Sequence, residues 1–490
     1  MNFNLTLGMD SFVPFEAYRL NRPKLLWINL PLYKKYGLFI DKHEVDDEVY
    51  SYTLDKFAFS TLGNKWNESS TFYAERYGGL GISYNGGGAR AGINGNFQVK
   101  GIGPTPLVGD KSPFWYSNGL FPLAEAIKEV VWSEVLNSLL PHGAVECLAI
   151  IDSGIDAFSD VHKNKVRCRG GLVVRENALR VAHFERASLF SNPAVNFVKD
   201  YDRTEQAINY FLTYLDNQCS DISTYLEKVV YQWAQQIAYA RSNSIMHGSL
   251  SSSNMCIDGR WIDFGTATCS THYTNVIAAI GNESFWDEEQ AIIRIIYELV
   301  FHINKFSKNR CHINTELLKD IFNSTFDIEF KCQILVKLGV GKACVQELIQ
   351  LSSFDDFYNL FTSLLKKGKM EAHTGVPYFS DKIGKYSFCD LKNIIYGKIP
   401  LTATEFILNQ KFNDLINAYT NSHLINTDTL MSEMYDNSIH VNHNYDYLHF
   451  DVVMREIEEL LSSDYSMEKI RRYIESKVNL QIDGCSKHVY

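Results

Sequence analysis

Eleven glycines lie between residues 78 and 109, and they limit the structure that this part of the chain can adopt. Glycine at this density is typical of turns and close backbone approaches, and it disfavours helix interiors. Strand-like runs lie among and after the glycines, at 96–100, 146–151 and 171–175. Apolar residues recur at spacings of three and four from Leu123 to Leu140, which predicts one amphipathic helix between the strands.

The character of the sequence changes after residue 195. Four segments have the apolar spacing of amphipathic helices, at 205–215, 222–241, 286–302 and 452–478, and one strand-rich interruption lies at 254–268. This order predicts an α+β, bilobal chain. We expect a β-rich N-lobe over residues 1–190, a helical C-lobe over 191–370 and a helical C-terminal extension over 371–490.

The composition excludes several broad classes of protein. The 490 residues are 46% hydrophobic, which excludes a wholly disordered chain, and the net charge of −10 disfavours a broadly basic nucleic-acid binder. No stretch approaches the roughly 18 apolar residues of a membrane span, and no secretory signal is visible. The ten cysteines are scattered without a CxxC pair, as is typical of reduced thiols. We therefore expect a cytoplasmic protein with no nucleic-acid or membrane partner.

The strongest local signal is His247-Gly-Ser-Leu-Ser-Ser-Ser-Asn254, followed by Asp263-Phe-Gly265. The catalytic loop of a protein kinase has a His, then an Asn that holds Mg²⁺, and later an Asp-Phe-Gly whose Asp holds the same ions. Ser249 stands where such a kinase has its catalytic Asp. The alternative is a buried structural histidine and a chance tripeptide, which the order and spacing of the two elements disfavour.

A site of this kind also needs a strand lysine paired with a helix glutamate. Lys100 ends a strand-like run, and the predicted helix offers Glu125, Glu129 and Glu134. The preceding segment 85–90 is glycine-rich, so its backbone N–H groups can cover phosphates. Neither a Walker A sequence nor a GxGxxG fingerprint is present, so ordinary turns are the alternative for these glycines.

The run Phe97-Gln-Val-Lys-Gly-Ile-Gly-Pro-Thr-Pro106 closely resembles the Leu-Lys-Gly-x-Gly-Pro-Thr-Pro signature of the selenoprotein O family. Further matches keep their order and approximate spacing, at 126–129, 133–134, 180–185, 247–248, 254–255 and 262–265. The similarity covers roughly residues 75 to 350. It implies a protein-kinase-like (pseudokinase) fold that binds ATP in an inverted orientation and transfers AMP to protein hydroxyls.

The resemblance implies roles for individual residues. Lys100 should contact phosphate, Glu129 should pair with it, and Asp263 should complete the catalytic set. Asn254 and Asp263 should hold Mg²⁺. The residues implied to bind the nucleotide are Gly87, Ala89, Arg90, Lys100, Asn118, Gly119, Arg175 and Arg180.

Two of the three arginines in this set share one implied role, and one dipeptide departs from the family pattern. Arg175 and Arg180 should form the pocket for the inverted γ-phosphate, a natural use of forked guanidinium donors. Without the resemblance, a surface ion pair would be the default interpretation of each arginine. Asn118-Gly119 departs from the Asp-Gly of the family.

A second departure bears on the chemistry. The family has an Asp, its proposed proton acceptor, where this chain has Ser253. Ser249 and Ser253 are the two plausible base positions, and a serine cannot take a proton near pH 7. One explanation is a catalytically inactive nucleotide-binding scaffold. The other is an acceptor that needs no base, such as a carboxylate, which is already ionised at neutral pH.

We favour the carboxylate, because the metal, lysine and arginine positions are all retained. The chain is then similar to relatives of selenoprotein O in siderophore-microcin maturation. Those relatives act with an acyltransferase-like partner on the C-terminal carboxyl of a peptide. The predicted substrates are therefore ATP, Mg²⁺ and a protein or peptide acceptor, and Ser/Thr/Tyr hydroxyls are the alternative acceptors.

Two further groups of residues carry weaker signals. His440, His443, His449 and Asp451 lie close together, but their spacing fits no standard metal site, so solvated loop histidines are favoured. Cys269 and Cys485 resemble a redox pair proposed for the family. Two inert thiols are the simpler interpretation.

Overall fold

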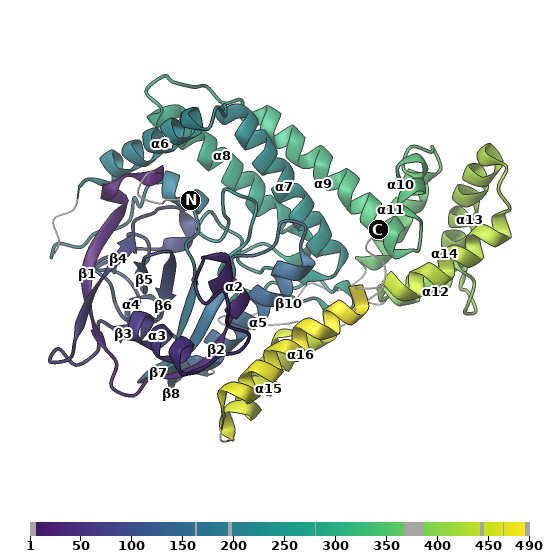
Figure 1. Ribbon diagram of the computed structural model, residues 1–490. Coiled ribbons are helices and arrows are strands. Elements are labelled where there is room, and N and C mark those ends of the chain that lie inside the picture. Colours follow the sequence, from purple (N-terminus) through teal and green to yellow (C-terminus); the bar gives the residue numbers. More distant parts are fainter. Residues whose placement is uncertain are drawn as a thin grey trace.

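The strands of the first part of the chain form one antiparallel sheet in the computed structural model, in the order β2-β7-β8-β6-β5-β4-β1-β3 (Figure 1). The residues described are 6–161, 164–194, 198–279, 281–366, 386–441, 445–463 and 465–485. The strands of this sheet are β1 (Phe12–Arg19), β2 (Lys24–Ile28), β3 (Phe59–Ser60), β4 (Ser69–Glu75), β5 (Ala91–Asn94), β6 (Phe97–Lys100), β7 (Cys147–Val161) and β8 (Asn164–Glu176).

All three strand-like runs expected from the sequence lie in this sheet, as β6 and as parts of β7 and β8. Sequence inspection missed the first strands and the two short helices among them, α2 (Leu30–Lys35) and α3 (Asp47–Phe57). The mixed architecture, an antiparallel sheet followed by many helices, is compatible with the expected α+β class.

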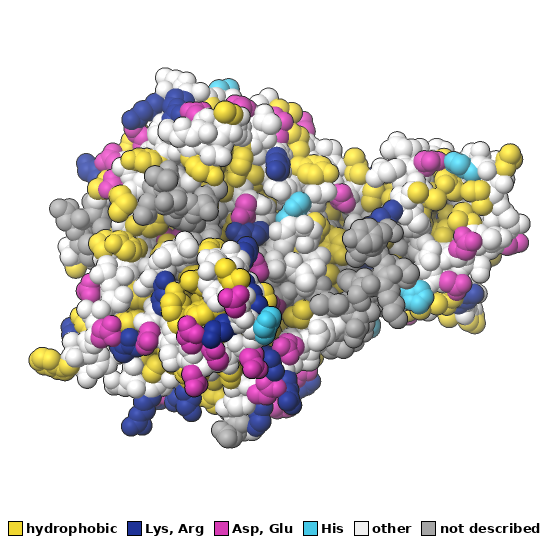
Figure 2. Space-filling view, in the orientation of Figure 1, with side chains coloured by type: hydrophobic (Ala, Val, Ile, Leu, Met, Phe, Trp, Pro, Cys, Tyr) yellow, Lys and Arg dark blue, Asp and Glu magenta, His cyan; other side chains and the backbone are white. Residues whose placement is uncertain are grey.

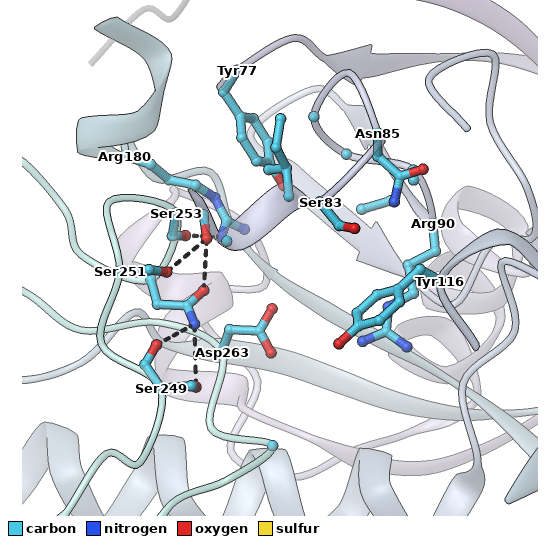
Figure 3. A pocket seen from close by; sticks show the side chains of 18 of the residues that line it. Tyr77, Ser83, Asn85, Arg90, Tyr116, Arg180, Ser249, Ser251, Ser253 and Asp263 are labelled. Carbon is cyan, nitrogen blue, oxygen red and sulfur yellow. Dashed lines mark hydrogen bonds between the residues drawn. The ribbon is translucent and has the colours of Figure 1, made fainter. Parts of the chain in front are cut away.

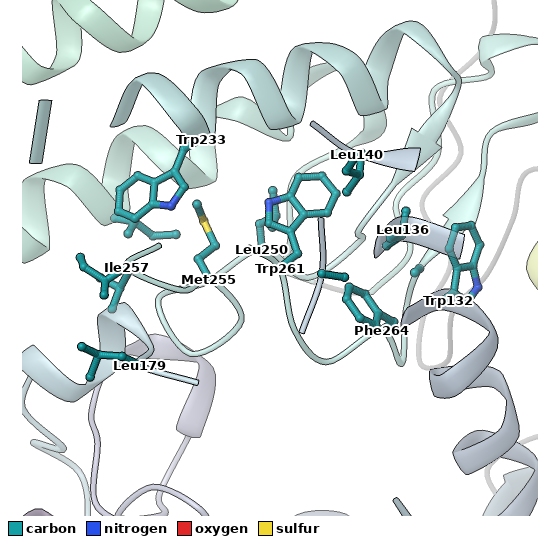
Figure 4. Packing of buried hydrophobic residues seen from close by; sticks show 14 of the residues in the cluster. Trp132, Leu136, Leu140, Leu179, Trp233, Leu250, Met255, Ile257, Trp261 and Phe264 are labelled. Atoms are coloured by element: carbon teal, nitrogen blue, oxygen red, sulfur yellow. The ribbon is translucent and has the colours of Figure 1, made fainter. Parts of the chain in front are cut away.

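The predicted amphipathic helix is present as α5 (Leu123–Leu139) and lies against β7 and β8. It is buried on nearly all sides, because the second half of the chain packs on its other face. Figure 4 shows Trp132 and Leu136 of this helix beside Phe264, with Trp261 and Trp233 further along the same hydrophobic cluster. This cluster joins α5 to the 247–264 loop and so fixes one side of the candidate site.

The rest of the chain is mainly helical. The helices after the sheet are α6 (Asp200–Asn217), α7 (Ile222–Ser242), α8 (Glu289–Phe306), α9 (Thr315–Lys337), α10 (Lys342–Leu348) and α11 (Phe354–Leu365). Those of the C-terminal part are α12 (Phe388–Ile395), α13 (Ala403–His423), α14 (Thr427–Val441), α15 (Phe450–Ser462) and α16 (Met467–Cys485). Short 3₁₀ turns are η1 (Met9–Ser11), η2 (Leu80–Ile82), η3 (Val181–Phe184), η4 (Thr271–Tyr273), η5 (Phe285–Asp287) and η6 (Asp446–Leu448).

Two predictions about these elements were wrong. The segment 254–268 forms three isolated bridges, one to Ala144, one to Arg180 and one within itself, and its one strand is β10 (Thr268–Cys269), which pairs with β9 (Ile245–Met246). Because the bridges go to different partners, no ladder propagates along the segment. The single helix expected over 452–478 is two helices, since Ser466 caps the backbone N–H of Lys469 and starts α16 anew.

The last two helices return to the first part of the chain. Both α15 and α16 pack on α5, and α16 also lies against β2, whereas α12 to α14 extend to the far side of α9 to α11 (Figure 1). The residues expected to form an extension are thus helical where described, and the boundaries of the three predicted units stay predictions. Across the described part of the chain, no helix is long and apolar enough to cross a membrane.

Candidate functional site

A cavity of about 470 Å³ lies between the sheet and the 247–266 segment. Figure 3 shows Arg180, Ser253 and Asp263 on one side of this first cavity and Arg90 and Tyr116 on the other. The residues of the predicted site that line it are Gly87, Ala89, Arg90, Lys100, Arg175, Arg180, Asn254 and Asp263. Positions spread over some 180 residues of sequence therefore meet at one place.

Lys100 joins the two halves of the site. It is the last residue of β6, and its Nζ lies 2.5 Å from Oε2 of Glu129 and 2.6 Å from Oδ1 of Asp263. The ion pair expected between Lys100 and Glu129 is therefore present. The ammonium group also lies 4.5 Å from the centre of the Phe121 ring, which excludes water from that side.

Arg175 is held in place by groups behind the cavity. Its Nη1 donates to Oε1 of Glu129 over 2.7 Å, and its Nε and Nη2 both donate to Oε1 of Gln98, over 2.9 and 2.7 Å. Gln98 in turn donates to Glu75, whose other carboxylate oxygen lies 3.3 Å from Nε2 of His183. This buried chain fixes the guanidinium rigidly at the cavity wall.

Arg180 is more directly available to a ligand. It precedes η3, lies over the ring of Tyr77 at 5.3 Å and donates through Nη1 to the carbonyl of Ser253. Its Nε is enclosed and has no acceptor among the residues described. Arg180 therefore lines the cavity with fewer hydrogen bonds from its guanidinium than Arg175 makes.

Asp263 is the only carboxylate among the described residues that line the first cavity. Its backbone has a φ of 71°, in the left-handed region that is uncommon for a residue with a side chain. Burial opposes ionisation of its carboxyl, but Lys100, Arg175, Arg90 and Arg180 together hold its pKa well below the usual range. Asp263 is thus a permanent anion among cations.

The 247–254 loop is anchored by a buried carboxylate. Glu288 accepts from the backbone N–H of Gly248 over 2.6 Å and from that of His247 over 3.3 Å. His247 is enclosed between Trp261 and Phe264, and burial lowers its pKa to about 4, so it is neutral at pH 7. The alternative of a structural histidine is thus correct for His247 itself, while the loop that it supports still lines the cavity.

The hydroxyls of this loop bond to one another. Ser251 and Ser253 share a hydrogen bond of 2.9 Å, and Ser249 accepts from Thr266 over 2.7 Å (Figure 3). Asn254 donates from Nδ2 to the carbonyl of Ser249 over 2.9 Å, which leaves its Oδ1 toward Ser253. Neither Ser249 nor Ser253 contacts a carboxylate that could accept its proton among the described contacts.

The opposite wall depends on glycine. A Cβ on Gly87, which has a φ of 133°, would lie 2.1 Å from the carbonyl of Glu75, so no side chain fits there. Arg90 follows on the same turn and stacks on Phe121 at 5.1 Å. Asn118 and Gly119 are absent from the described lining of the cavity, and Gly119 instead accepts from the N–H of Gly103. Their nucleotide contact stays a prediction.

The donor set suits a magnesium ion bound together with phosphates. Mg²⁺ prefers oxygen ligands and is commonly held by one or two side chains plus substrate phosphates. Asp263 and Asn254 offer a carboxylate and an amide oxygen at one cavity. Among the residues described, no three His, Cys, Asp or Glu side chains gather into a metal site built from protein ligands alone.

The weaker signals gain no support. His449 lies 4.0 Å from Asp451 and burial lowers its pKa, but His443 lies outside the described residues. Cys269 is a buried free thiol whose pKa is raised by burial, and the side chain of Cys485 is outside the described residues. The redox pair stays a prediction.

Several residues of the site were missed from the sequence. Gln98, Glu75 and Glu288 hold functional side chains in place from strands and loops far apart in sequence, and no local pattern marks them. Tyr77 and Tyr116 line the cavity, and only their position beside the glycine cluster could have indicated them.

A cavity lined by arginines, one lysine and one ionised carboxylate belongs to the class of sites that bind phosphate groups. Residues 4–477 match the family model described as "Protein adenylyltransferase SelO", and the chain belongs to that family. It is also similar to "Protein nucleotidyltransferase YdiU" of Clostridium beijerinckii, with 26% identity over 261 residues. That match covers 50% of this chain and 47% of the relative, so the chain matches about half the length of that relative.

Proposed function

We propose that this chain is an ATP- and Mg²⁺-dependent nucleotidyltransferase with a kinase-like arrangement of two lobes, which transfers AMP to a protein or peptide acceptor. The observation that carries the proposal is the convergence of Lys100, Arg90 and Arg180 on one cavity that holds a single ionised carboxylate, Asp263. Membership of a family described as protein adenylyltransferases supports the same reaction.

The chain's own residues supply binding and orientation. Lys100, Arg90 and Arg180 are placed to bind a triphosphate, and Glu129 keeps Lys100 at the end of β6. Asn254 and Asp263 would hold Mg²⁺, which when bound neutralises phosphate charge. Phe121 stacks against both Arg90 and Lys100 and limits water there.

The preferred acceptor is a peptide C-terminal carboxylate. Asp263 is ion-paired with Lys100 and its pKa is depressed, so it cannot accept the proton of a hydroxyl near pH 7. A carboxylate acceptor brings no proton to remove. Its oxygen forms a bond to the α-phosphorus, the bond from that phosphorus to the β-phosphate oxygen breaks, and pyrophosphate leaves with the electron pair.

The product of that step is an acyl-adenylate. An acyltransferase-like partner could use such an activated peptide in coupling reactions of the siderophore-microcin type. Adenylylation of Ser, Thr or Tyr hydroxyls and an inactive nucleotide-binding scaffold are the competing functions. The hydroxyl reaction is consistent with the serines at 249 and 253 only if a base comes from elsewhere, whereas the scaffold needs no base.

Parallel incubations with α-labelled and γ-labelled ATP and a mixture of peptides with free C-termini test the proposal. We expect label in peptide from the α position alone, lost on treatment with hydroxylamine, which cleaves acyl-adenylates. Stable α label would indicate a hydroxyl acceptor. Transfer from the γ position would overturn AMP transfer, and bound ATP without any turnover would indicate a scaffold.

A further inference from the structure

A second cavity, of about 330 Å³, adjoins the first. Leu80, Ile82 and Ser83 line both cavities, so the η2 turn is a wall between them. The far wall of the second cavity is formed by the segment from Glu185 to Leu189 and by one side of α8, including Phe301. No residue of this second cavity was singled out as functional from the sequence.

The floor of the second cavity contains a buried carboxylate with an unused oxygen. Glu185 is 3% exposed, and its Oε2 accepts from the hydroxyl of Ser252 over 2.7 Å. Its Oε1 is enclosed and has no hydrogen-bond donor among the residues described. A buried carboxylate oxygen without a donor is costly, so it requires a donor from outside the described residues, which a bound ligand can supply.

A complementary donor lies on the next residue. The Nε–H of Arg186 is also enclosed and has no acceptor among the described residues, while its guanidinium lies 5.8 Å from the Tyr201 ring. One unused acceptor and one unused donor on adjacent residues match the two polar groups of a peptide unit, whose N–H donates and whose carbonyl accepts.

The shape of this floor is set by two glycines. A Cβ on Gly79 would lie 2.3 Å from Oε2 of Glu185, and a Cβ on Gly78 would lie 2.2 Å from the backbone of Arg186. The 78–79 backbone therefore presses directly on both residues, and no side chain intervenes between it and the cavity floor.

The rim is apolar. Leu80 is 84% exposed, Leu189 61% and Phe301 56%, which is high for large hydrophobic side chains around one cavity. Glu298 and Lys305 add one charge of each sign beside them. Apolar side chains around a small number of buried polar groups are typical of ligand-binding clefts, and the mixed charges do not favour a polyanion.

We propose that the second cavity binds the backbone of the acceptor polypeptide next to the residue that is modified. Glu185 accepts from a peptide N–H, Arg186 donates to a peptide carbonyl, and Leu189 and Phe301 contact the flanking side chains. A segment held there passes over Leu80 to the mouth of the first cavity. This inference depends on the proposed AMP transfer in one respect: that reaction identifies the bound polypeptide as the acceptor. Burial also raises the pKa of Glu185 to about 7.

A phage-displayed library of random linear peptides, panned against the full-length protein, tests the proposal. Enriched peptides are synthesised, and their affinity is measured by fluorescence anisotropy for the wild type, Leu189→Asp, Phe301→Asp and Glu185→Gln. Leu189 and Phe301 are exposed, so their replacement leaves the fold intact. Leu317→Asp is the matched control, because Leu317 is an exposed leucine of α9 outside the described lining of either cavity.

We expect roughly ten-fold or greater loss of peptide affinity in Leu189→Asp and Phe301→Asp, a smaller loss in Glu185→Gln, which keeps one acceptor oxygen, and none in Leu317→Asp. Equal peptide affinity for all five proteins would overturn the inference. The inference would also be overturned if panning enriched no peptide on the wild type relative to Leu189→Asp. AMP transfer to the same peptides is measured separately. Peptide binding that depends on Leu189 without any AMP transfer would refute the proposed function and leave the binding cavity standing.

Discussion

Asp263 lies among four cations, and its charge has opposite consequences for binding and for turnover. Lys100 contacts it directly, and Arg90, Arg175 and Arg180 lower the pKa of its carboxyl from further away. Without a metal, this carboxylate repels the phosphates that the same cations attract. With a metal, it supplies one of the two oxygen ligands that the cavity offers.

Asp263→Asn therefore separates binding from turnover. We expect ATP to bind at least as tightly as to the wild type when Mg²⁺ is absent, because a negative charge has been removed. We expect AMP transfer in Mg²⁺ to fall by about 100-fold or more. Calorimetric titration and label transfer measure the two effects. Unchanged transfer would show that the metal assignment is wrong.

Glu288 positions the 247–254 loop without lining the first cavity. Glu288→Ala leaves the backbone N–H groups of His247 and Gly248 without their acceptor, at a cost of about 1–3 kcal/mol for each buried group. We expect lower stability toward urea and reduced AMP transfer. The two N–H groups bond to different oxygens of Glu288, so Glu288→Gln, which keeps one acceptor oxygen, should recover part of both losses. Equal losses in the two variants would argue against this anchoring role.

The site residues that were predicted lie in short, recognisable sequence motifs, and those that were missed do not. Lys100 and Asp263 were predicted because each lies in a short run with a specific order, and the structure brings them within 2.6 Å. The anchoring of Arg175 by Gln98 and Glu129 was not predicted, since it depends on strands β6 and β8 being neighbours. Unused polar atoms such as Oε1 of Glu185 exist only in the folded chain.

At the scale of elements, α5 connects the sheet, the Asp263 segment and the C-terminal helices. Lys128 of this helix donates to the carbonyl of Gly265 over 2.5 Å and lies 4.0 Å from the Phe450 ring at the start of α15. The backbone N–H of Phe450 donates to Thr268 over 3.1 Å. One buried lysine therefore links α5, the segment after Asp263 and α15.

Burial lowers the pKa of Lys128 to about 8 from an ordinary value near 10.5. Below pH 8 the amine is charged in both folded and unfolded chains, so its contribution to stability is constant. Between about pH 8 and 10.5 the folded chain releases the proton first, and the free energy of unfolding rises by up to about 1.4 kcal/mol for each pH unit.

The comparison of wild type with Lys128→Met isolates this effect. We expect the wild type to gain stability relative to Lys128→Met as the pH rises from 8 to 10, as measured by urea denaturation at each pH. A difference between the two proteins that is independent of pH would contradict the depressed pKa.

The elements themselves were only partly predictable. Helix α5 was recognised to within one residue, because a long apolar period is a strong signal. The same apolar period continues through 452–478, so it did not reveal the break between α15 and α16. At this break, Ser466 caps the first turn of α16. Strands such as β1 and β4 were missed, since each buries only part of its residues and carries weak alternation.

At the scale of the whole molecule, the chain folds back on itself: α15 and α16 cover the helix that carries Glu129. Other described contacts also keep the C-terminal helices against the first part of the chain, including the hydrogen bond of 2.9 Å from the Tyr465 hydroxyl to Asp152 of β7. Acidic and basic side chains intermix over the face drawn in Figure 2, consistent with ion pairs between neighbouring side chains. The C-terminal helices are therefore part of the structure that positions the site.

Ile474 of α16 tests this role. It is 2% exposed within the main hydrophobic cluster, so Ile474→Ala should lower the free energy of unfolding by about 2–5 kcal/mol. AMP transfer should fall as well if α5 loosens. Ile439→Ala is the matched control: that side chain is 52% exposed, and a change within about 0.5 kcal/mol is expected. Similar effects of the two substitutions would contradict the structural role of α16.

Mass spectrometry of peptide acceptors after incubation with ATP and Mg²⁺ tests the central claim most directly. Wild-type protein should add the mass of one AMP to a peptide and release one pyrophosphate for each adduct, and Asp263→Asn should add none. Peptides whose C-terminal carboxyl is amidated should stay unmodified by the wild type if the carboxylate is the nucleophile. A phosphate adduct in place of AMP, or an AMP adduct formed equally well by Asp263→Asn, would contradict the account.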